Sequence, residues 1–363
     1  MKKSTTTIVS CVIILLFVSI VFVSGTSTYA QNQASNSDLS SQRQNIITKT
    51  VAKCSPAVVG IHVSEIIQYR NYWNPFVVYN QPVKGLGSGS LISPDGYILT
   101  NDHVAGNSYE AVVTLTDGKQ YTAKVIGSDQ TSDICLLKID AKNLPYIKFG
   151  DSDDIMAGEW AIAFGNPFGL FDINDKPSVT VGVVSATRMN IGPSDNRYYI
   201  NMIQTDAAIN QGNSGGPLVN AVGELIGMNT LIFTAGSAGN VGVGFAIPAN
   251  KIQKVVQELK TKGKVDRDFW TGLHILTIDE NIAKRYKLAS SRGCIITEFD
   301  KNSPAVKSGL QLEDIIIGID NYRINDQDIL IGILTEYRTG DVVNYKIIRD
   351  GKEQTVKMKL EKR

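Results

Sequence analysis

The chain has 363 residues, of which 43% are hydrophobic and 20% charged, and its 36 Lys and Arg against 35 Asp and Glu give a net charge of +1. At about 150 residues per domain, this length suggests two folded domains. The charge balance argues against nucleic-acid binding through a broad basic surface, and the apolar content argues against a mainly disordered chain.

The N-terminal segment has the pattern of an export signal. Two lysines precede an apolar run over residues 8–23, and the tripeptide ending at Ala30 has small residues at both recognition positions of a cleavage site. Residues 1–30 are expected to be a signal peptide or, because the run is only slightly short for a bilayer span, a membrane anchor. Either way, the rest of the chain is expected to be extracytoplasmic, in the periplasm or at the cell surface. Residues 31–45, rich in Gln, Asn and Ser, predict a flexible linker.

The cysteines indicate neither a metal site nor a disulfide scaffold. Cys11, Cys54, Cys135 and Cys294 are widely separated, form no CxxC pair, and accompany only three histidines. No zinc site is expected from this pattern. Buried free thiols are favoured for the three cysteines beyond the apolar run, with a disulfide between Cys54 and Cys135 as the alternative.

From residue 46 the sequence becomes a series of short apolar runs, each ended by Gly, Asp or Asn. A short opening helix is expected around residues 51–53. Strands are expected at 57–63, 89–92, 97–100, 110–115, 119–128, 134–139, 160–164, 178–184, 199–205, 217–219, 225–229 and 242–247. Many evenly spaced strands without intervening helices predict two packed six-stranded β-barrels.

A helix and a second unit follow. Apolar residues at helical spacing predict a helix over 249–262, which Gly263 ends. The expected elements beyond it are strands at 293–298, 315–319 and 342–349 and a helix at 326–337. We therefore predict one domain over residues 46–263 and another over 267–363.

Three segments of the first domain carry the residue types that acyl transfer needs. His103 follows an expected strand, Asp133 enters another, and Ser214 lies in the glycine-rich stretch Gly-Asn-Ser-Gly-Gly. Acyl transfer uses a nucleophilic hydroxyl, an imidazole base and a carboxylate that orients the base. The order His, Asp, Ser is that of the chymotrypsin arrangement. The backbone amides of Gly212 and Ser214 are expected to form the oxyanion hole.

The sequence around these residues resembles the HtrA/Deg family of serine proteases. The resemblance rests on residues 87–104, 165–169, 205–218 and 242–248, which include the motifs TNDHV, GNPFG and TDAAINQGNSGGPL. It extends over about residues 46–361. It implies a mainly β fold, a chymotrypsin-like double β-barrel protease domain followed by one PDZ-like α+β domain.

The same resemblance implies an activity and an assembly. The expected protein is an ATP-independent serine endopeptidase of protein quality control that cleaves unfolded or misfolded proteins, needs no cofactor, and forms a homotrimer. Two other functions are open: a membrane-tethered stress-sensor protease that makes one site-specific cut, and a chaperone-like binder of unfolded chains. The complete triad disfavours the binder.

Residues near the nucleophile predict the specificity. Ala208 stands six positions before Ser214, where trypsin-like enzymes carry an acidic specificity residue. The other residues expected to shape the S1 pocket are Ile209, Asn229, Thr230 and Leu231. Cleavage is therefore expected after small apolar residues such as Val or Ala. Asn213 rather than Asp precedes the serine, so activation by zymogen cleavage is not expected.

In the C-terminal domain, four residues stand where the family places its carboxylate-binding loop: Trp270, Thr271, Gly272 and Leu273. A PDZ domain binds a C-terminal peptide by capturing its carboxylate there and pairing it with a sheet edge. Thr271 departs from the family's apolar residue at its position. A PDZ-like domain that only packs on the protease is therefore the alternative.

Three loops are expected to control the oxyanion turn: 188–199, 233–240 and the insertion 66–86. The insertion is rich in aromatic residues, namely Tyr69, Tyr72, Trp73, Phe76 and Tyr79. In the resembled family such an insertion reaches neighbouring subunits, and an arginine near position 188 relays PDZ or substrate binding to the active site. Arg188 is therefore a regulatory candidate.

Overall fold

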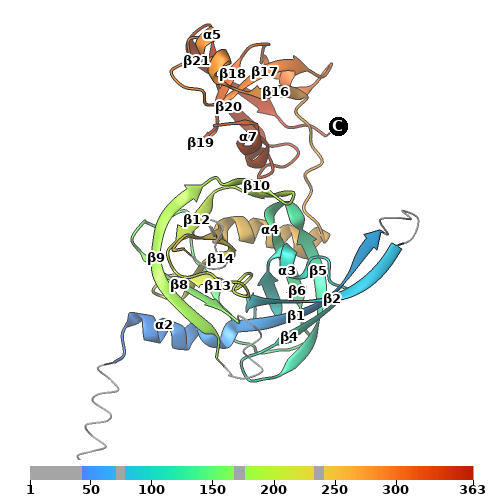
Figure 1. Ribbon diagram of the computed structural model, residues 1–363, viewed down its shortest axis with the longest axis vertical. Coiled ribbons are helices and arrows are strands. Elements are labelled where there is room, and N and C mark those ends of the chain that lie inside the picture. Colours follow the sequence, from blue (N-terminus) through green and yellow to red (C-terminus); the bar gives the residue numbers. More distant parts are fainter. Residues whose placement is uncertain (1–42, 71–77, 167–175, 233–240, 363) are drawn as a thin grey trace, which may run out of the picture. The chain divides into compact units, whose positions relative to one another are not determined.

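A computed structural model describes residues 43–70, 78–166, 176–232 and 241–362 (Figure 1). The expected signal or anchor, most of the linker and the loop 233–240 lie outside the described residues. Within the described ranges, no helix is both long enough and apolar enough to cross a membrane.

The first six strands close into a barrel with the order β1-β2-β3-β6-β5-β4. The strands are β1 (Val58–Arg70), β2 (Val78–Leu91), β3 (Tyr97–Thr100), β4 (Glu110–Thr114), β5 (Gln120–Asp129) and β6 (Ile134–Lys138). The short helical elements of this part are α2 (Ile46–Cys54), η1 (Ser55–Ala57), α3 (Asp102–Ala105) and η2 (Gln130–Ser132). Fully buried side chains such as Ile61, Leu91, Ile98 and Leu136 supply the apolar interior that stabilises this barrel.

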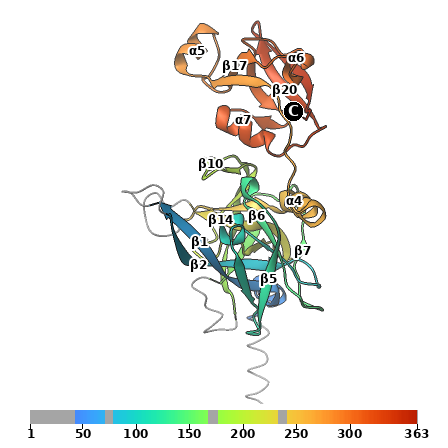
Figure 2. The ribbon, with the colours of Figure 1, turned by 90° about the vertical axis from the view of Figure 1, so that its right-hand side faces the viewer.

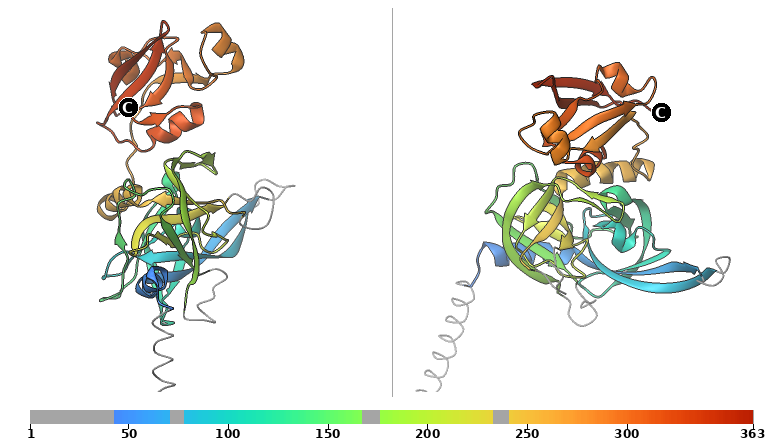
Figure 3. Two further views of the ribbon diagram at one scale, coloured as in Figure 1. Left: turned by 90° about the vertical axis from the view of Figure 1, so that its left-hand side faces the viewer. Right: turned by 45° about the horizontal axis from the view of Figure 1, so that its top comes forward.

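A second barrel follows. Its strands are β7 (Lys148–Phe149), β8 (Trp160–Gly165), β9 (Ser178–Met189), β12 (Met202–Thr205), β13 (Pro217–Val219), β14 (Glu224–Ile232) and β15 (Gly244–Pro248). The order β13-β8-β9-β12-β15-β14 closes through a β13–β14 pairing, and β7 adds to β14 in parallel. A separate two-stranded hairpin consists of β10 (Gly192–Ser194) and β11 (Arg197–Tyr199). Figures 1 and 3 show the two barrels as neighbours.

The predicted double barrel is confirmed, with differences at particular strands. The single strand expected at 199–205 is divided, because Asn201 adopts a positive φ of 62° that interrupts the extended backbone. β9 runs to Met189, five residues beyond the expected end at Val184. The backbone of the insertion 66–86 continues β1 and β2 as a paired hairpin, whereas its tip and its aromatic side chains lie outside the described part of the chain.

The helix α4 (Ala249–Lys262) has its predicted bounds, and Gly263 caps it with a φ of 72° and an N–H that donates to Leu259 over 3.0 Å. The elements beyond it are β16 (Leu273–Thr277), α5 (Glu280–Arg285), β17 (Cys294–Phe299), α6 (Pro304–Ser308), β18 (Ile315–Ile319), β19 (Tyr322–Arg323), α7 (Gln327–Leu334), β20 (Val342–Arg349) and β21 (Lys352–Lys359). The sheet order is β16-β17-β18-β20-β21, with β19 beside β18. Figure 1 labels these strands, and Figure 2 shows β17, β20 and α7 from a second side. Ile296, Tyr345, Ile347 and Met358 are buried in its core.

Candidate active site

His103 and Asp133 are brought together by two chain connections of the first barrel. α3 begins directly after β3, and His103 lies in its first turn. Asp133 adopts a left-handed backbone conformation (φ 58°, ψ 42°) between η2 and β6. Its carboxylate accepts hydrogen bonds from the His103 ring Nδ1 over 2.8 Å and from the His103 backbone N–H over 3.0 Å. With Nδ1 donating to Asp133, Nε2 is left to accept a proton.

The carboxylate of Asp133 accepts hydrogen bonds from several further donors. Its side chain is fully buried, whereas that of His103 is 34% exposed. The Thr230 hydroxyl donates to this carboxylate over 2.8 Å, the Asn101 amide over 3.2 Å and the Tyr199 phenol over 3.4 Å. Burial acts to raise the pKa of Asp133, but the hydrogen bonds from His103 and its charge outweigh burial and lower that pKa. Asp133 is therefore a carboxylate at neutral pH.

A mostly buried arginine lies beside the same carboxylate. The Arg197 Nη2 donates to Asp102 Oδ2 over 3.0 Å, and its Nε lies 3.2 Å from Asp133 Oδ1 as an ion pair without hydrogen-bond alignment. Asp102 also accepts a hydrogen bond of 2.6 Å from the Ser128 hydroxyl. Burial acts to lower the pKa of Arg197, but the two aspartates outweigh it and raise that pKa. The sequence analysis missed Asp102 and Arg197, because only the fold brings together two residues 95 positions apart.

Ser214 lies in a tight turn that requires glycine. Gly212 and Gly215 have φ values of 93° and 82°. A Cβ at Gly215 would lie 2.2 Å from the carbonyl oxygen of Ser88, so a side chain does not fit there. Within the part of the chain that the structure describes, the N–H groups of Gly212 and Ser214 donate to no protein acceptor, whereas that of Asn213 donates to Asn210 over 3.0 Å. Two amide donors are thus open at the predicted oxyanion hole.

Ser88 fixes this turn from the first barrel. Its hydroxyl donates to the carbonyl oxygen of Gly212 over 2.5 Å, and its N–H donates to the carbonyl oxygen of Ser214 over 2.9 Å. The backbone N–H of Asn166 donates in turn to the Ser88 hydroxyl over 2.7 Å. The side chain of Ser88 is fully buried, so these bonds are shielded from water.

Ser214, the predicted nucleophile, is not paired with His103, the predicted base, in this structure. The Ser214 hydroxyl donates to the carbonyl oxygen of Thr230 over 3.3 Å, and among the described residues it makes no hydrogen bond to His103. Catalytic hydrogen bonds are often long or unformed without substrate. A rotation of the Ser214 side chain is needed before proton transfer.

The side chains of three residues predicted to shape the S1 pocket have other contacts. Ile209 is buried in the core of the second barrel. Asn229 is fully buried, and its amide donates to two backbone carbonyls. Thr230 donates to Asp133 and thus supports the triad. These contacts were not foreseen in the sequence.

Ala208 also contacts the turn that holds Ser214, since its carbonyl oxygen accepts a hydrogen bond of 3.5 Å from the Asn213 side chain. The side chain of Leu231 lies outside the described part of the chain. The S1 assignment stays a prediction.

The predicted carboxylate loop of the C-terminal domain lines one side of a groove. The lining residues are Arg267, Phe269, Trp270, Thr271, Gly272, Leu273, His274, Asp300, Ile331, Leu334 and Thr335. The groove thus combines the loop and the start of β16 with α7. Gly272 has a φ of 68°, and the N–H of Leu273 donates to the Thr271 hydroxyl over 3.3 Å. One of the loop amides expected to face a carboxylate is therefore engaged by Thr271.

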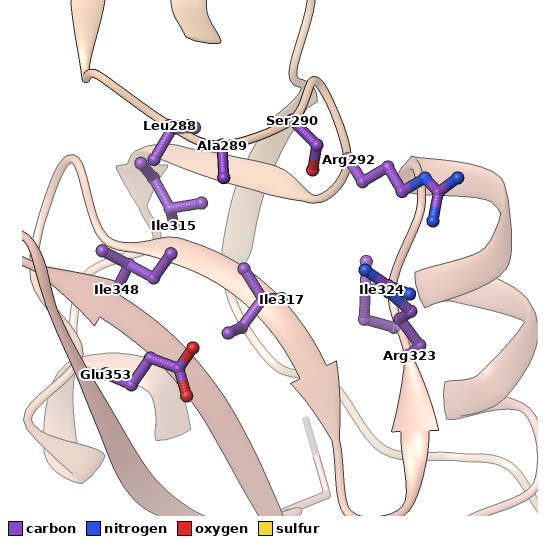
Figure 4. A pocket seen from close by; sticks show the side chains of 10 residues that line it. All are labelled: Leu288, Ala289, Ser290, Arg292, Ile315, Ile317, Arg323, Ile324, Ile348 and Glu353. Atoms are coloured by element: carbon purple, nitrogen blue, oxygen red, sulfur yellow. The ribbon is translucent and has the colours of Figure 1, made fainter.

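The remaining candidates lie elsewhere. Arg188 is exposed, has a φ of 57°, and lines a small cavity with Asp153 and Asn201. A further cavity of the C-terminal domain, shown in Figure 4, is lined by isoleucines of β18 and β20 together with Arg292 and Arg323, and it contains none of the predicted site residues.

Comparisons with known proteins agree with this arrangement. A model of the trypsin-like peptidase domain matches residues 87–228, and a PDZ domain model matches residues 257–360. The chain is 40% identical over 343 residues to a probable periplasmic serine endoprotease DegP-like of Marinomonas sp. (strain MWYL1), covering 87% of this chain and 71% of that protein. It is 44% identical over 267 residues to the protein of the same name from Chlamydia muridarum, covering 73% of this chain and 52% of that protein, about half its length.

Solved structures are also similar. An HtrA-type protease, AlgW, with a tripeptide has a TM-score of 0.67 at 33% identity, covering 88% of this chain and 98% of that one. The serine endoprotease from Yersinia pestis has a TM-score of 0.57 at 31% identity, with the same two coverages.

Proposed function

Because the chain belongs to the HtrA-type serine proteases, we propose that it is an exported, ATP-independent serine endopeptidase that uses His103, Asp133 and Ser214. The observation that carries this proposal is the joint geometry of the site. A buried, ionised Asp133 orients His103, and Ser214 lies in a turn with two open amide donors. The names of the curated relatives support a periplasmic or other extracytoplasmic location.

In the proposed reaction, His103 acts first as a base and then as an acid, in both the acylation and the deacylation of Ser214. His103 takes the proton of the Ser214 hydroxyl as the oxygen attacks the peptide carbonyl, and Asp133 stabilises the imidazolium that forms. The amides of Gly212 and Ser214 bind the developing oxyanion, an interaction whose loss costs about 3–4 kcal/mol per donor. His103 then protonates the leaving amine. Water releases the acyl group by the same steps, with His103 again as base.

The substrates we propose are unfolded or misfolded proteins, cut after small apolar residues. The support for this specificity is Ala208, because no carboxylate stands at that position to pair with Lys or Arg. C-terminal peptides are proposed to bind the groove between α7 and the loop 270–273, in agreement with the match to a PDZ domain. We further propose domain bounds of 46–263 and 267–363, and a homotrimeric assembly as in the resembled family.

A second candidate is a regulatory protease that makes one specific cut. The observation that favours it is the apolar run over residues 8–23, which is only slightly short for a bilayer span and would tether the protein if it were retained. N-terminal sequencing of the exported protein separates the two candidates. A retained segment 1–30 supports the tethered regulatory protease, and a new N-terminus near residue 31 supports the released quality-control protease.

Labelling with a fluorophosphonate tests the proposed nucleophile. The reagent phosphonylates a serine only where a base and an oxyanion hole activate it. The expected result is one labelled peptide that contains Ser214, and no label in the His103→Ala variant. Labelling at another serine, or none in a protein that hydrolyses casein, would overturn the assignment.

A further inference from the structure

Two buried carboxylates, those of Asp133 and Asp102, lie on the same arginine, Arg197, next to His103. Asp133 is fully buried, and Asp102, its neighbour in α3, is 5% exposed. Asp133 hydrogen-bonds to the ring, whereas Asp102 bonds to Ser128 and Arg197. Like charges buried close together disfavour ionisation, and each uncompensated carboxylate adds to the negative potential at a neighbouring base.

Arg197 is placed to offset one of these charges. It hydrogen-bonds to Asp102 and lies within ion-pair distance of Asp133, and its own side chain is 13% exposed. Since successive side chains of a strand alternate in direction, Arg197 and Tyr199 share one face of β11, and both reach Asp133. Two side chains on one face of β11 thus contact Asp133, the carboxylate of the proposed triad.

The other titratable groups around this cluster are neutral. Burial and the charge of Asp133 raise the pKa of the Tyr199 phenol, and burial raises the pKa of the Cys135 thiol to about 12. Within the described residues, the charged groups at this cluster besides the His103–Asp133 pair are therefore Arg197, which forms an ion pair with Asp133, and Asp102, which is bonded to Arg197. Their charges sum to zero, so the base is paired with one net negative charge, as in an ordinary triad.

We propose that Asp102 and Arg197 form a neutral positioning pair that sets the electrostatic potential at His103 and thereby the pH range in which the base is active. The proposal rests on the triad assigned above and adds two residues that act through it. Removing Arg197 leaves two negative charges beside the imidazole, which holds its proton to higher pH. Removing the charge of Asp102 leaves a net charge of zero, and the imidazole loses its proton at lower pH. The two changes therefore have opposite signs.

The test is the acid limb of the pH profile of kcat/KM for a peptide substrate, because this limb reports protonation of the base in the free enzyme. Its midpoint is expected to rise by about 0.5–1 pH unit in Arg197→Gln and to fall by a similar amount in Asp102→Asn. In the double variant the shifts cancel, and the midpoint returns to within about 0.2 unit of the wild type, because the net charge is restored. Arg285→Gln, an exposed arginine of α5, is the matched control and leaves the midpoint unchanged.

The midpoint of the acid limb does not depend on how much of the enzyme is correctly folded, so a partly unfolded variant still gives a valid value. Phosphonate titration measures the active fraction of each variant. If Arg197→Gln yields no active enzyme, Arg197→Lys, with wild-type midpoint, and Asp102→Asn, with lowered midpoint, decide the question. An unchanged midpoint in Asp102→Asn or in Arg197→Gln, or shifts of the same sign in these two variants, would overturn the pair's electrostatic role. No hydrolysis by the wild type would instead overturn the proposed function itself.

Discussion

The hydroxyl of Ser88, in the first barrel, donates a 2.5 Å hydrogen bond to the carbonyl oxygen of Gly212, which lies 124 residues later in the second barrel. This bond orients the peptide that precedes Asn213, and with it the two open amides of the oxyanion turn. In this chain Asn213 rather than Asp precedes Ser214, so no acid stands there to pair with a new N-terminus, and internal contacts such as that of Ser88 hold the turn.

Replacing Ser88 by Ala is expected to lower kcat for a short peptide about tenfold while KM changes little, because the oxyanion donors act on the transition state more than on the substrate. Steady-state kinetics with phosphonate-titrated enzyme measures this. Ser308→Ala, which also removes a serine hydroxyl bonded to a backbone carbonyl, is the control and keeps wild-type kcat. A Ser88→Ala enzyme with wild-type kcat would show that the turn is held without this bond.

Thr271→Val is expected to tighten binding of a C-terminal peptide several-fold. The substitution removes the hydroxyl that accepts the Leu273 N–H and leaves that amide to the peptide carboxylate. Fluorescence polarisation with a labelled peptide that ends in an apolar residue measures the change in affinity. The same peptide with an amidated C-terminus shows whether the carboxylate contributes to binding. Equal or weaker binding by Thr271→Val would contradict this account of the loop.

Peptides with Val or Ala at P1 are expected to be cut at least about tenfold faster than peptides with Lys or Arg, because no buried acid offsets the desolvation of a cation. A peptide library with a fixed sequence around a varied P1 residue measures kcat/KM for each. A preference for Arg at P1 would contradict this specificity and would show that a carboxylate from another part of the chain lines the S1 pocket.

The three described cysteines are expected to resist thiol reagents in the folded protein. Cys54, Cys135 and Cys294 are free and buried, and burial raises their pKa values to about 11, 12 and 12. Since the thiolate is the reactive form, at pH 8 a Cys11→Ser variant should react slowly when native and give three thiols in denaturant. Only one thiol in denaturant without reductant would instead support a disulfide between Cys54 and Cys135.

Much of the fold could be predicted from apolar runs ended by turn residues. β3, α4, β18 and β20 have their predicted bounds because each lies between clear turn or cap signals. The split at Asn201 could not be predicted, since a positive φ there depends on the bond between its N–H and the side chain of Asn190.

At the site, His103, Asp133 and Ser214 could be predicted because each lies in a short motif of the local sequence. The contacts of Thr230 with Asp133, and of Arg197 with Asp102, could not be inferred in the same way, because each joins segments about 100 residues apart whose approach depends on barrel closure. Ser88 stood within the resembled motif, but its bond to Gly212 needed the fold.

The central claim is that Ser214 is the nucleophile of a peptide-bond hydrolase. It is tested most directly by the rate of casein cleavage by the purified wild-type protein and by Ser214→Ala, with circular dichroism to confirm equal folding. The account predicts cleavage by the wild type without ATP and a loss of at least about 10³-fold in the variant. Cleavage by Ser214→Ala at near the wild-type rate would contradict it.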